Sequence, residues 1–158
     1  MVVKTQDEVL TTEELAYIAG IFDGEGTVTI NVYNANRPYG IIKVRYLQVS
    51  LSSTDRDTIN YLKDTFGGSV FTTKAIGNRK EIRRWLIVSR TATDFLARVL
   101  PYLRVKKEHA ILGIDFQLTL RPGIEHSKLP SDLLEWQEFY IERIRTLNAR
   151  GSGKSNNS

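Results

Sequence analysis

The 158-residue chain has no cysteine, only two histidines and no long apolar run. The lack of cysteine excludes a disulfide framework and a cysteine-ligated zinc site, and two histidines argue against a classical zinc site. The first ten residues, MVVKTQDEVL, lack the apolar stretch of a secretory signal, and no segment is long enough to cross a bilayer. We therefore expect a soluble, intracellular protein with no membrane partner.

What is present is the composition of a globular protein. Hydrophobic residues make up 41% of the chain and charged residues 25%, which is ordinary for a folded domain. The length also fits one domain. We expect a single domain over residues 1–150, followed by a polar, disordered tail over residues 151–158 (GSGKSNNS).

The charge is laid out unevenly along the chain. Residues 1–36 carry one Lys/Arg and six Asp/Glu, residues 37–107 carry fifteen and five, and residues 108–150 carry five and seven. The middle segment therefore has a net charge of +10, from fifteen minus five. A basic middle between acidic flanks is typical of a protein that binds nucleic acid. A solvated basic face without a partner fits the same pattern.

Helical and alternating patterns follow one another in a repeated order. Thr11 and Glu14 have the spacing of a capping box for the first helix, and strict alternation after Gly26 predicts a strand. Residues 34–40 are interpreted as a loop because of Pro38. The expected elements are a helix over 11–23, strands over 27–34 and 42–52, a helix over 54–66 capped by Thr54, strands over 69–74 and 82–89, and helices from 91 or 93 to 100, over 106–120 and from 131. The apolar stripes expected for the last two helices are Ala110, Ile111, Ile114 and Leu118, and then Leu133, Trp136, Tyr140, Ile144 and Leu147.

This order predicts an α+β fold with a four-stranded, mainly antiparallel sheet built from two hairpins, helices on one face and further helices at the C-terminus. The other face of the sheet would carry hydrogen-bonding side chains and an arginine. They are Thr29, Asn31, Tyr33, Gln48, Ser50, Ser69, Thr73 and Arg84. Such side chains can read base edges in a major groove, which admits a β-ribbon. A solvated sheet surface is the alternative.

The segment Leu15–Gly26, LAYIAGIFDGEG, has two stripes at helical spacing. Leu15, Ile18 and Phe22 form an apolar stripe for the core, whereas Ala16, Gly20 and Gly24 form a stripe of small residues. Together with Asp23, these small residues are expected to form the dimer interface. Glycine inside a helix costs about 1 kcal/mol relative to alanine, so a compensating close approach of two helices across a two-fold axis is expected.

Asp23 and Glu25 fall at the C-terminal end of this helix. The helix dipole disfavours negative charge there, which suggests a cation nearby. LAYIAGIFDGEG resembles the motif that names the LAGLIDADG homing endonucleases. The resemblance covers about 140 of the 158 residues and includes the αββαββα order and the segment Pro101–Lys107.

The resemblance implies a site-specific endonuclease of the single-motif type, encoded in an intron. Such an enzyme cuts double-stranded DNA as a homodimer at a long, pseudo-palindromic site, because one motif per chain leaves the two-fold to a second chain. It implies Mg²⁺ as cofactor, or another divalent cation such as Mn²⁺, with Ca²⁺ able to bind without supporting cleavage. A non-cleaving relative, such as an RNA maturase or a DNA-binding regulator, is the alternative. Glu25 favours the enzyme, because inactive relatives tend to lose this carboxylate.

The resemblance also implies roles for single residues. Glu25 matches the metal ligand, although aspartate is commoner there, and Gly24 matches a supplementary carbonyl ligand. Lys106 matches the basic catalytic residue beside the scissile phosphate. Ser53, or else Ser52, matches the residue that positions water, where the family often has glutamine, with Arg56 as a basic partner; Asp23 caps and orients.

Further basic residues are expected to contact DNA: Arg37, Lys43, Arg45, Arg83 and Lys106. Lys43 and Arg45 have the same parity as the inward apolar positions of their strand. Either a bulge or a twisted, exposed strand end would turn them outward, and the pattern leaves both open.

Overall fold

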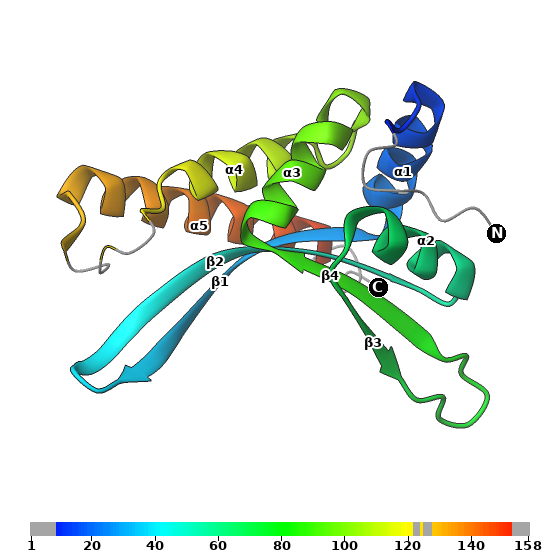
Figure 1. The fold of residues 1–158 in the computed structure, drawn as a ribbon, viewed down its shortest axis with the longest axis horizontal. Helices are drawn as coiled ribbons and strands as arrows, with labels where there is room; N and C mark the ends of the chain where they lie inside the picture. The colour runs from blue at the N-terminus through cyan, green and yellow to red at the C-terminus, as the bar shows by residue number, and fades with distance from the viewer. Residues whose placement is uncertain (1–8, 122–123, 125–127, 153–158) are drawn as a thin grey trace.

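The computed structural model describes residues 9–121, 124 and 128–152. Within this part of the chain, helices lie on one face of a four-stranded sheet, and the two hairpins of the sheet spread apart on the other side like the legs of an arch (Figure 1). No helix among the described residues is long and apolar enough to span a membrane.

The order of the elements confirms the predicted αββαββα arrangement followed by helices. The elements are α1 (Thr12–Glu25), β1 (Gly26–Arg37), β2 (Gly40–Ser53), α2 (Arg56–Phe66), β3 (Ser69–Thr73), β4 (Ile82–Val88), α3 (Ser89–Val99), η1 (Leu100–Tyr102), α4 (Lys107–Leu118) and α5 (Ser131–Ser152). The predicted capping box of α1 is present, with Thr11 and Glu14 each bonded to the other's backbone N–H. The first two residues of the predicted tail, 151 and 152, belong to α5, and residues 153–158 lie outside the described part of the chain.

The sheet has the order β1-β2-β4-β3, and every neighbouring pair is antiparallel. The β1–β2 register runs without interruption from Gly26 opposite Leu51 to Arg37 opposite Gly40. The loop predicted over 34–40 is therefore wrong, because only Pro38 and Tyr39 remain unpaired. Proline fits the first central position of a tight turn, and Gly40 adopts a φ of +132° directly after it.

An aromatic cluster joins the helices to the sheet. The ring of Phe95 on α3 lies 5.4 Å from that of Phe22, 4.9 Å from that of Phe66 and 5.2 Å from that of Trp85, all between centroids and close to edge-on. These partners come from α1, α2 and β4, and Phe22, Phe95 and Trp85 are fully buried. Edge-to-face packing adds to the stabilisation from burial, so this cluster fixes α1 against the rest of the fold.

The face that α4 buries differs from the predicted one. Of the predicted stripe, Ala110 is buried, whereas Ile111 is 42% exposed and Leu118 67% exposed. Leu112 and Phe116 are buried instead, because α4 packs on α5, on α3 and on the sheet. A helix with neighbours on several sides has no single apolar stripe, and periodicity then misplaces the buried face.

The start of α5 is also turned away from its predicted orientation. Trp136, predicted to be in the core, is 52% exposed, whereas the neighbouring Gln137 is buried. Gln137 accepts a hydrogen bond from the Arg45 guanidinium at 3.2 Å and donates one to the Thr119 carbonyl at 3.3 Å. These bonds to β2 and α4 hold Gln137 inward and leave Trp136 on the surface.

The direct passage from α1 into β1 makes Gly26 intolerant of a side chain. A Cβ at Gly26 would lie 2.1 Å from the ring of buried Phe22. We expect Gly26→Ala to lower the free energy of unfolding by about 1–3 kcal/mol through overpacking, measured by urea denaturation. Thr12→Ala is the control, because Thr12 is exposed at the start of the same helix. Equal unfolding midpoints for Gly26→Ala and the unaltered chain would contradict this packing.

Candidate functional site

The small-residue stripe of α1 lies on the surface of the chain. Ala16, Gly20 and Gly24 are exposed, and the neighbouring Tyr17 is 62% exposed. A Cβ added at Gly20 or Gly24 would meet no atom within 4 Å among the described residues. The opposite side of the helix carries buried Ile18 and Phe22, as predicted. The helix therefore presents a smooth, unoccupied side to solvent.

Asp23 connects the end of α1 to the segment before α4. Its carboxylate accepts three backbone N–H groups, from Arg104 at 2.9 Å, Val105 at 3.1 Å and Lys106 at 3.0 Å. Asp23 also borders a cavity of about 400 Å³ together with Ala16 and Gly20. The structure thus places Asp23 beside the small-residue stripe, and its hydrogen bonds give it the role of a cap.

Lys106 is brought to the end of α1 by these hydrogen bonds. It lies at the start of α4, and its backbone N–H reaches a side chain only two positions before Glu25. Burial lowers the pKa of the half-buried His109, and the charge of Lys106 lowers it further. The lowered pKa favours the neutral form of the imidazole.

Glu25 and Gly24 are both exposed at the C-terminus of α1. Within the described residues, no hydrogen bond or ion pair engages the Glu25 carboxylate, and no three His, Asp or Glu side chains gather closely enough to hold a metal ion. One chain therefore offers the Glu25 carboxylate and nearby backbone carbonyls as oxygen donors, without a complete ligand set of its own.

The two serines at the end of β2 point in different directions. Ser52 is opposite Arg84 and Ser53 is opposite Arg83 in the register, so only Ser52 shares a face with Arg84. The Ser53 hydroxyl accepts the Asp55 N–H at 3.0 Å. The structure therefore leaves Ser52 on the open face of the sheet, whereas the hydroxyl of Ser53 is engaged in the turn before α2.

The start of α2 differs slightly from the prediction. Asp55, and not Thr54, caps the helix by accepting the N–H of Thr58. The hydrogen bond from the Thr58 side chain lowers the pKa of Asp55. Arg56 begins α2 as an exposed side chain, with its guanidinium 3.9 Å from the Glu81 carboxylate.

The open face of the sheet carries the polar residues predicted for it. The continuous registers place on this one face Thr29, Asn31, Tyr33, Arg37, Gln48, Ser50, Ser69, Thr73 and Arg84. Asn31 donates to Gln48 at 2.7 Å and Arg84 donates to Ser50 at 3.4 Å. The face is concave and lies on the side of the sheet away from the helices (Figure 1). Its curvature suits a cylindrical ligand.

Three of the predicted basic contacts do not lie on this face. Arg45 lies on the helix-covered face with a side chain that is 5% exposed, and it is ion-paired with Glu138 and hydrogen-bonded to Gln137. Its assignment as a DNA contact is corrected, because the register has no bulge and α5 neutralises its charge. Lys43, two residues earlier, is exposed but belongs to the same face of β2 as Arg45. Arg83 belongs to the same face of β4 as Trp85, and its guanidinium forms an ion pair with Glu81 at 3.5 Å.

Apolar side chains on the open face were missing from the prediction. Phe71 is opposite Arg84 in the register and 56% exposed, and Val88 is opposite Gln48 and 38% exposed. Tyr46 packs edge-on against Tyr33, with ring centroids 5.9 Å apart. Strict alternation along β2, β3 and β4 puts these residues on the same face as Gln48, Ser69 and Arg84, so the sequence pattern is sufficient to predict them.

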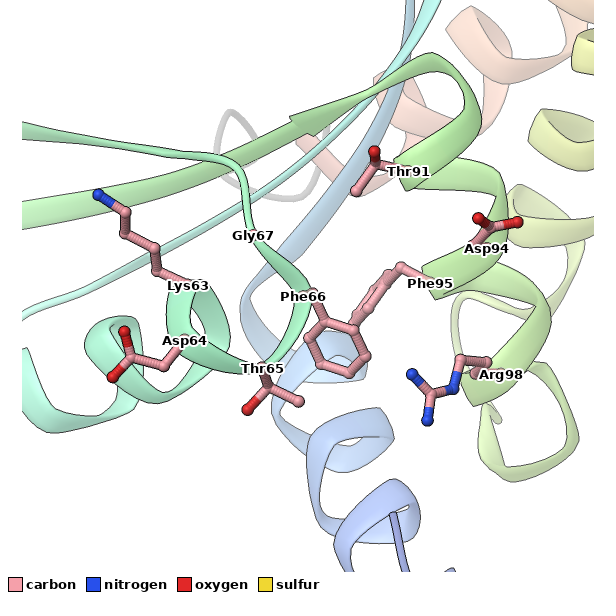
Figure 2. Close-up of a pocket in the computed structure, with 9 residues that line it drawn as sticks. All are labelled: Lys63, Asp64, Thr65, Phe66, Gly67, Thr91, Asp94, Phe95 and Arg98. Carbon is pink, nitrogen blue, oxygen red and sulfur yellow. The ribbon is translucent and has the colours of Figure 1, made fainter. Parts of the chain in front are cut away.

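A larger cavity lies away from these residues. It has a volume of about 530 Å³ and lies where the end of α2 meets α3, with the rings of Phe66 and Phe95 packed edge to face and Arg98 beside them (Figure 2). The Arg98 guanidinium is 5.6 Å from the Phe66 ring centroid. None of the predicted site residues lines it.

The fold is that of the LAGLIDADG homing endonucleases, as the motif predicted. The chain is similar to the homing endonuclease I-CvuI, solved in complex with its target, with a TM-score of 0.67, 18% identity and coverage of 85% of this chain and 82% of that chain. It is also similar to the archaeal intron-encoded homing endonuclease I-Vdi141I, solved with DNA (TM-score 0.64, 15% identity, 85% and 84% covered).

A third similar structure is the homing endonuclease I-TnaI, with a TM-score of 0.56 and 15% identity over 90% of this chain and 99% of that chain. No protein-family model matches the chain, and no curated protein matches it by sequence. The likeness is thus one of fold, and the chemistry of this chain has to be argued from its own residues.

The three hydrogen bonds to Asp23 predict a local effect of its substitution. Bonds to a charged acceptor contribute more than neutral ones, so Asp23→Asn should reduce the free energy of unfolding by about 1–2 kcal/mol. Amide hydrogen exchange of residues 104–106 should accelerate, measured by NMR. Asp64→Asn, near the end of α2, is the control without such bonds. Unchanged exchange at 104–106 would exclude Asp23 as their anchor.

Proposed function

We propose that this protein is a site-specific double-stranded DNA endonuclease that acts as a homodimer with a divalent cation. The observation that carries the proposal is the junction of α1 and β1. There Glu25 is exposed and makes no ion pair with another described residue, Asp23 holds the backbone of Lys106 alongside, and the polar sheet face begins directly afterwards. Hydrolytic groups and a recognition surface thus follow one another on consecutive elements.

The open sheet face is the proposed DNA-binding surface. It is concave beneath the helices (Figure 1), and its hydrogen-bonding side chains include Arg84 and Asn31 on opposite hairpins. Residues 37–107, which carry the net charge of +10, contribute three of the four strands wholly or in large part. Contacts of lysine and arginine with phosphates give affinity, and the polar face gives sequence preference. I-CvuI and I-Vdi141I, which share the fold, were solved with DNA.

Glu25 and the carbonyl of Gly24 are the proposed ligands of the cation. Mg²⁺ and similar hard cations prefer oxygen ligands, and the unengaged carboxylate at the negative end of the α1 dipole suits a positive ion. When bound, such an ion activates water and stabilises the leaving oxygen of a phosphodiester. The remaining ligands would come from a second chain, from water and from the DNA, since one chain offers too few.

Two side chains of this chain would act on the phosphate itself. Lys106, held beside the end of α1, would stabilise the charge that develops on the scissile phosphate. Ser52, on the open face, would orient a water molecule, and the exposed Arg56 would contribute further positive charge. Ser52 takes this role in place of Ser53, whose hydroxyl already accepts the Asp55 N–H.

The dimer is proposed to form through the small-residue stripe of α1. Ala16, Gly20 and Gly24 are exposed on one side of the helix, which would allow two helices to approach closely across a two-fold axis. The symmetry would bring the two Glu25 carboxylates together, one for each DNA strand. It would also set two sheets along the duplex, so that the target is pseudo-palindromic.

The proposal is tested by selection from random DNA. Purified protein is incubated with Mg²⁺ and a library of long randomised duplexes, and the cut fragments are sequenced. Recovery of one long site with two-fold related halves is expected. A protein that binds a site without cutting it in Mg²⁺ or Mn²⁺ would instead be a non-cleaving nucleic-acid-binding protein of this fold, a function that the retained Glu25 disfavours.

Glu25→Gln tests the catalytic assignment. The amide keeps the shape of the side chain but loses the charge that would hold the cation, so cleavage in Mg²⁺ should fall at least a hundredfold, on the order of one lost electrostatic contact to the reacting group. Binding to the same duplex in Ca²⁺ should stay within a few-fold. Glu13→Gln, at the other end of α1, is the matched control. Cleavage by Glu25→Gln at the unaltered rate would remove Glu25 from the reaction.

Gly20→Leu tests the dimer. A leucine would have room in the single chain, where nothing lies within 4 Å of the added Cβ, but not between two helices in contact. We expect a folded monomer by sedimentation, with an unchanged circular dichroism spectrum. Ala97→Leu, at an exposed position of α3, should remain dimeric. A Gly20→Leu protein of dimeric mass would contradict the proposed interface.

A further inference from the structure

Two amide side chains on the open face are already bonded to each other. Asn31 of β1 donates a hydrogen bond to Gln48 of β2, with 2.7 Å between the nitrogen and the oxygen. The residues are diagonal neighbours, since Asn31 is opposite Tyr46 and Gln48 is opposite Thr29 in the register. Both are partly exposed. They therefore form one polar unit that spans the first hairpin.

The bond between them determines what the unit offers to a ligand. It engages one N–H of the Asn31 amino group and one lone pair of the Gln48 oxygen, so the wholly unengaged groups of the pair are the Asn31 oxygen, an acceptor, and the Gln48 amino group, a donor. Exchanging nitrogen and oxygen in both amides gives the same result, one free donor beside one free acceptor. Within the described residues, neither free group makes another hydrogen bond.

A donor beside an acceptor matches one base in the major groove. Adenine presents its N7 as an acceptor and its N6 amino group as a donor. Guanine presents two acceptors, N7 and O6, so the unengaged oxygen of the unit would face another oxygen. Thymine offers an acceptor with a methyl group, and cytosine offers a donor alone. Adenine is thus the base whose edge satisfies both free groups.

The unit is also held in place before DNA arrives. The Asn31–Gln48 bond fixes both side chains, and the packed rings of Tyr33 and Tyr46 occupy the next diagonal on the same face. Val88 lies opposite Gln48 on β4 and offers no competing hydrogen bond. Side chains fixed in advance lose less conformational entropy on binding, which favours recognition by the bonded pair over recognition by either amide alone.

We propose that Asn31 and Gln48 act as a single unit that recognises one adenine in each half of the DNA target. This inference rests on the proposed function, and it adds which base is read and that two residues on different strands read it together. It also predicts that a single base pair in each half of the target depends on both Asn31 and Gln48.

The test uses the full-length protein and its selected site. Binding is measured in Ca²⁺ over all single-base variants for the unaltered chain, Asn31→Ala, Gln48→Ala and the double variant. Both single variants should lose discrimination at the same A·T pair, by about ten- to a hundredfold, and the double variant should lose no more than either. Asn34→Ala, an exposed asparagine on the opposite face of β1, should leave the profile unchanged.

Modified bases and a charge change sharpen the test. Replacing that adenine with 7-deazaadenine, which lacks the N7 acceptor, should weaken binding by the unaltered chain but not by the double variant. Gln48→Glu replaces the free donor by an acceptor, so the preference should move from adenine towards cytosine, whose N4 amino group donates. Thermal melts of each variant establish that it is folded.

The outcomes separate the two proposals. If the single variants relax two different positions, the amides read separately and the pair is not a unit. If no position changes, neither amide reads a base. If the unaltered chain selects no DNA site at all, the proposed function fails first, and the adenine assignment fails with it.

Discussion

Three backbone N–H groups converge on one carboxylate at the end of α1, and the arrangement of the site depends on this contact. Without it, the segment Arg104–Lys106 would lose the three hydrogen bonds that hold it to the end of α1, two residues before Glu25. The Asp23 carboxylate caps the segment Arg104–Lys106, which lies 81 to 83 residues further along the chain. A single side chain therefore joins two distant parts of the sequence at the point where chemistry is proposed.

The second constraint is the uninterrupted register of the sheet. Because no bulge shifts the alternation, each strand position is committed to one face. This commitment forces Arg45 towards the helices, where Glu138 and Gln137 of α5 accept its hydrogen bonds. The buried arginine in turn fixes the orientation of α5 and leaves Trp136 exposed. A charged residue at an inward position of β2 thus determines the packing of a helix some 90 residues later.

The sequence was sufficient for the order of the elements, the α1 cap and the polar sheet face, because these follow from spacing within one element. It was insufficient where several elements meet. The buried face of α4 depends on neighbours that periodicity does not reveal, and Arg45 looked like a surface cation because its partner Glu138 is distant in sequence. The choice between Ser52 and Ser53 depends on the sheet register, which puts Ser52 on the open face, and on the hydrogen bond that the Ser53 hydroxyl accepts from the Asp55 N–H.

The strict alternation of the strands has a consequence for how such a protein can change over time. Side chains on the open face, such as Asn31 and Arg84, share almost no packing with the core, whose sheet residues point the other way. If the open face binds DNA as proposed, their replacement would change which sequence is recognised, at little cost in folding. Mutations in a DNA target could then be matched by substitutions on the open face, while the core and the helix that carries Glu25 stay constant. One face of the sheet carries the core residues on which folding depends, and the other face carries the residues that can vary.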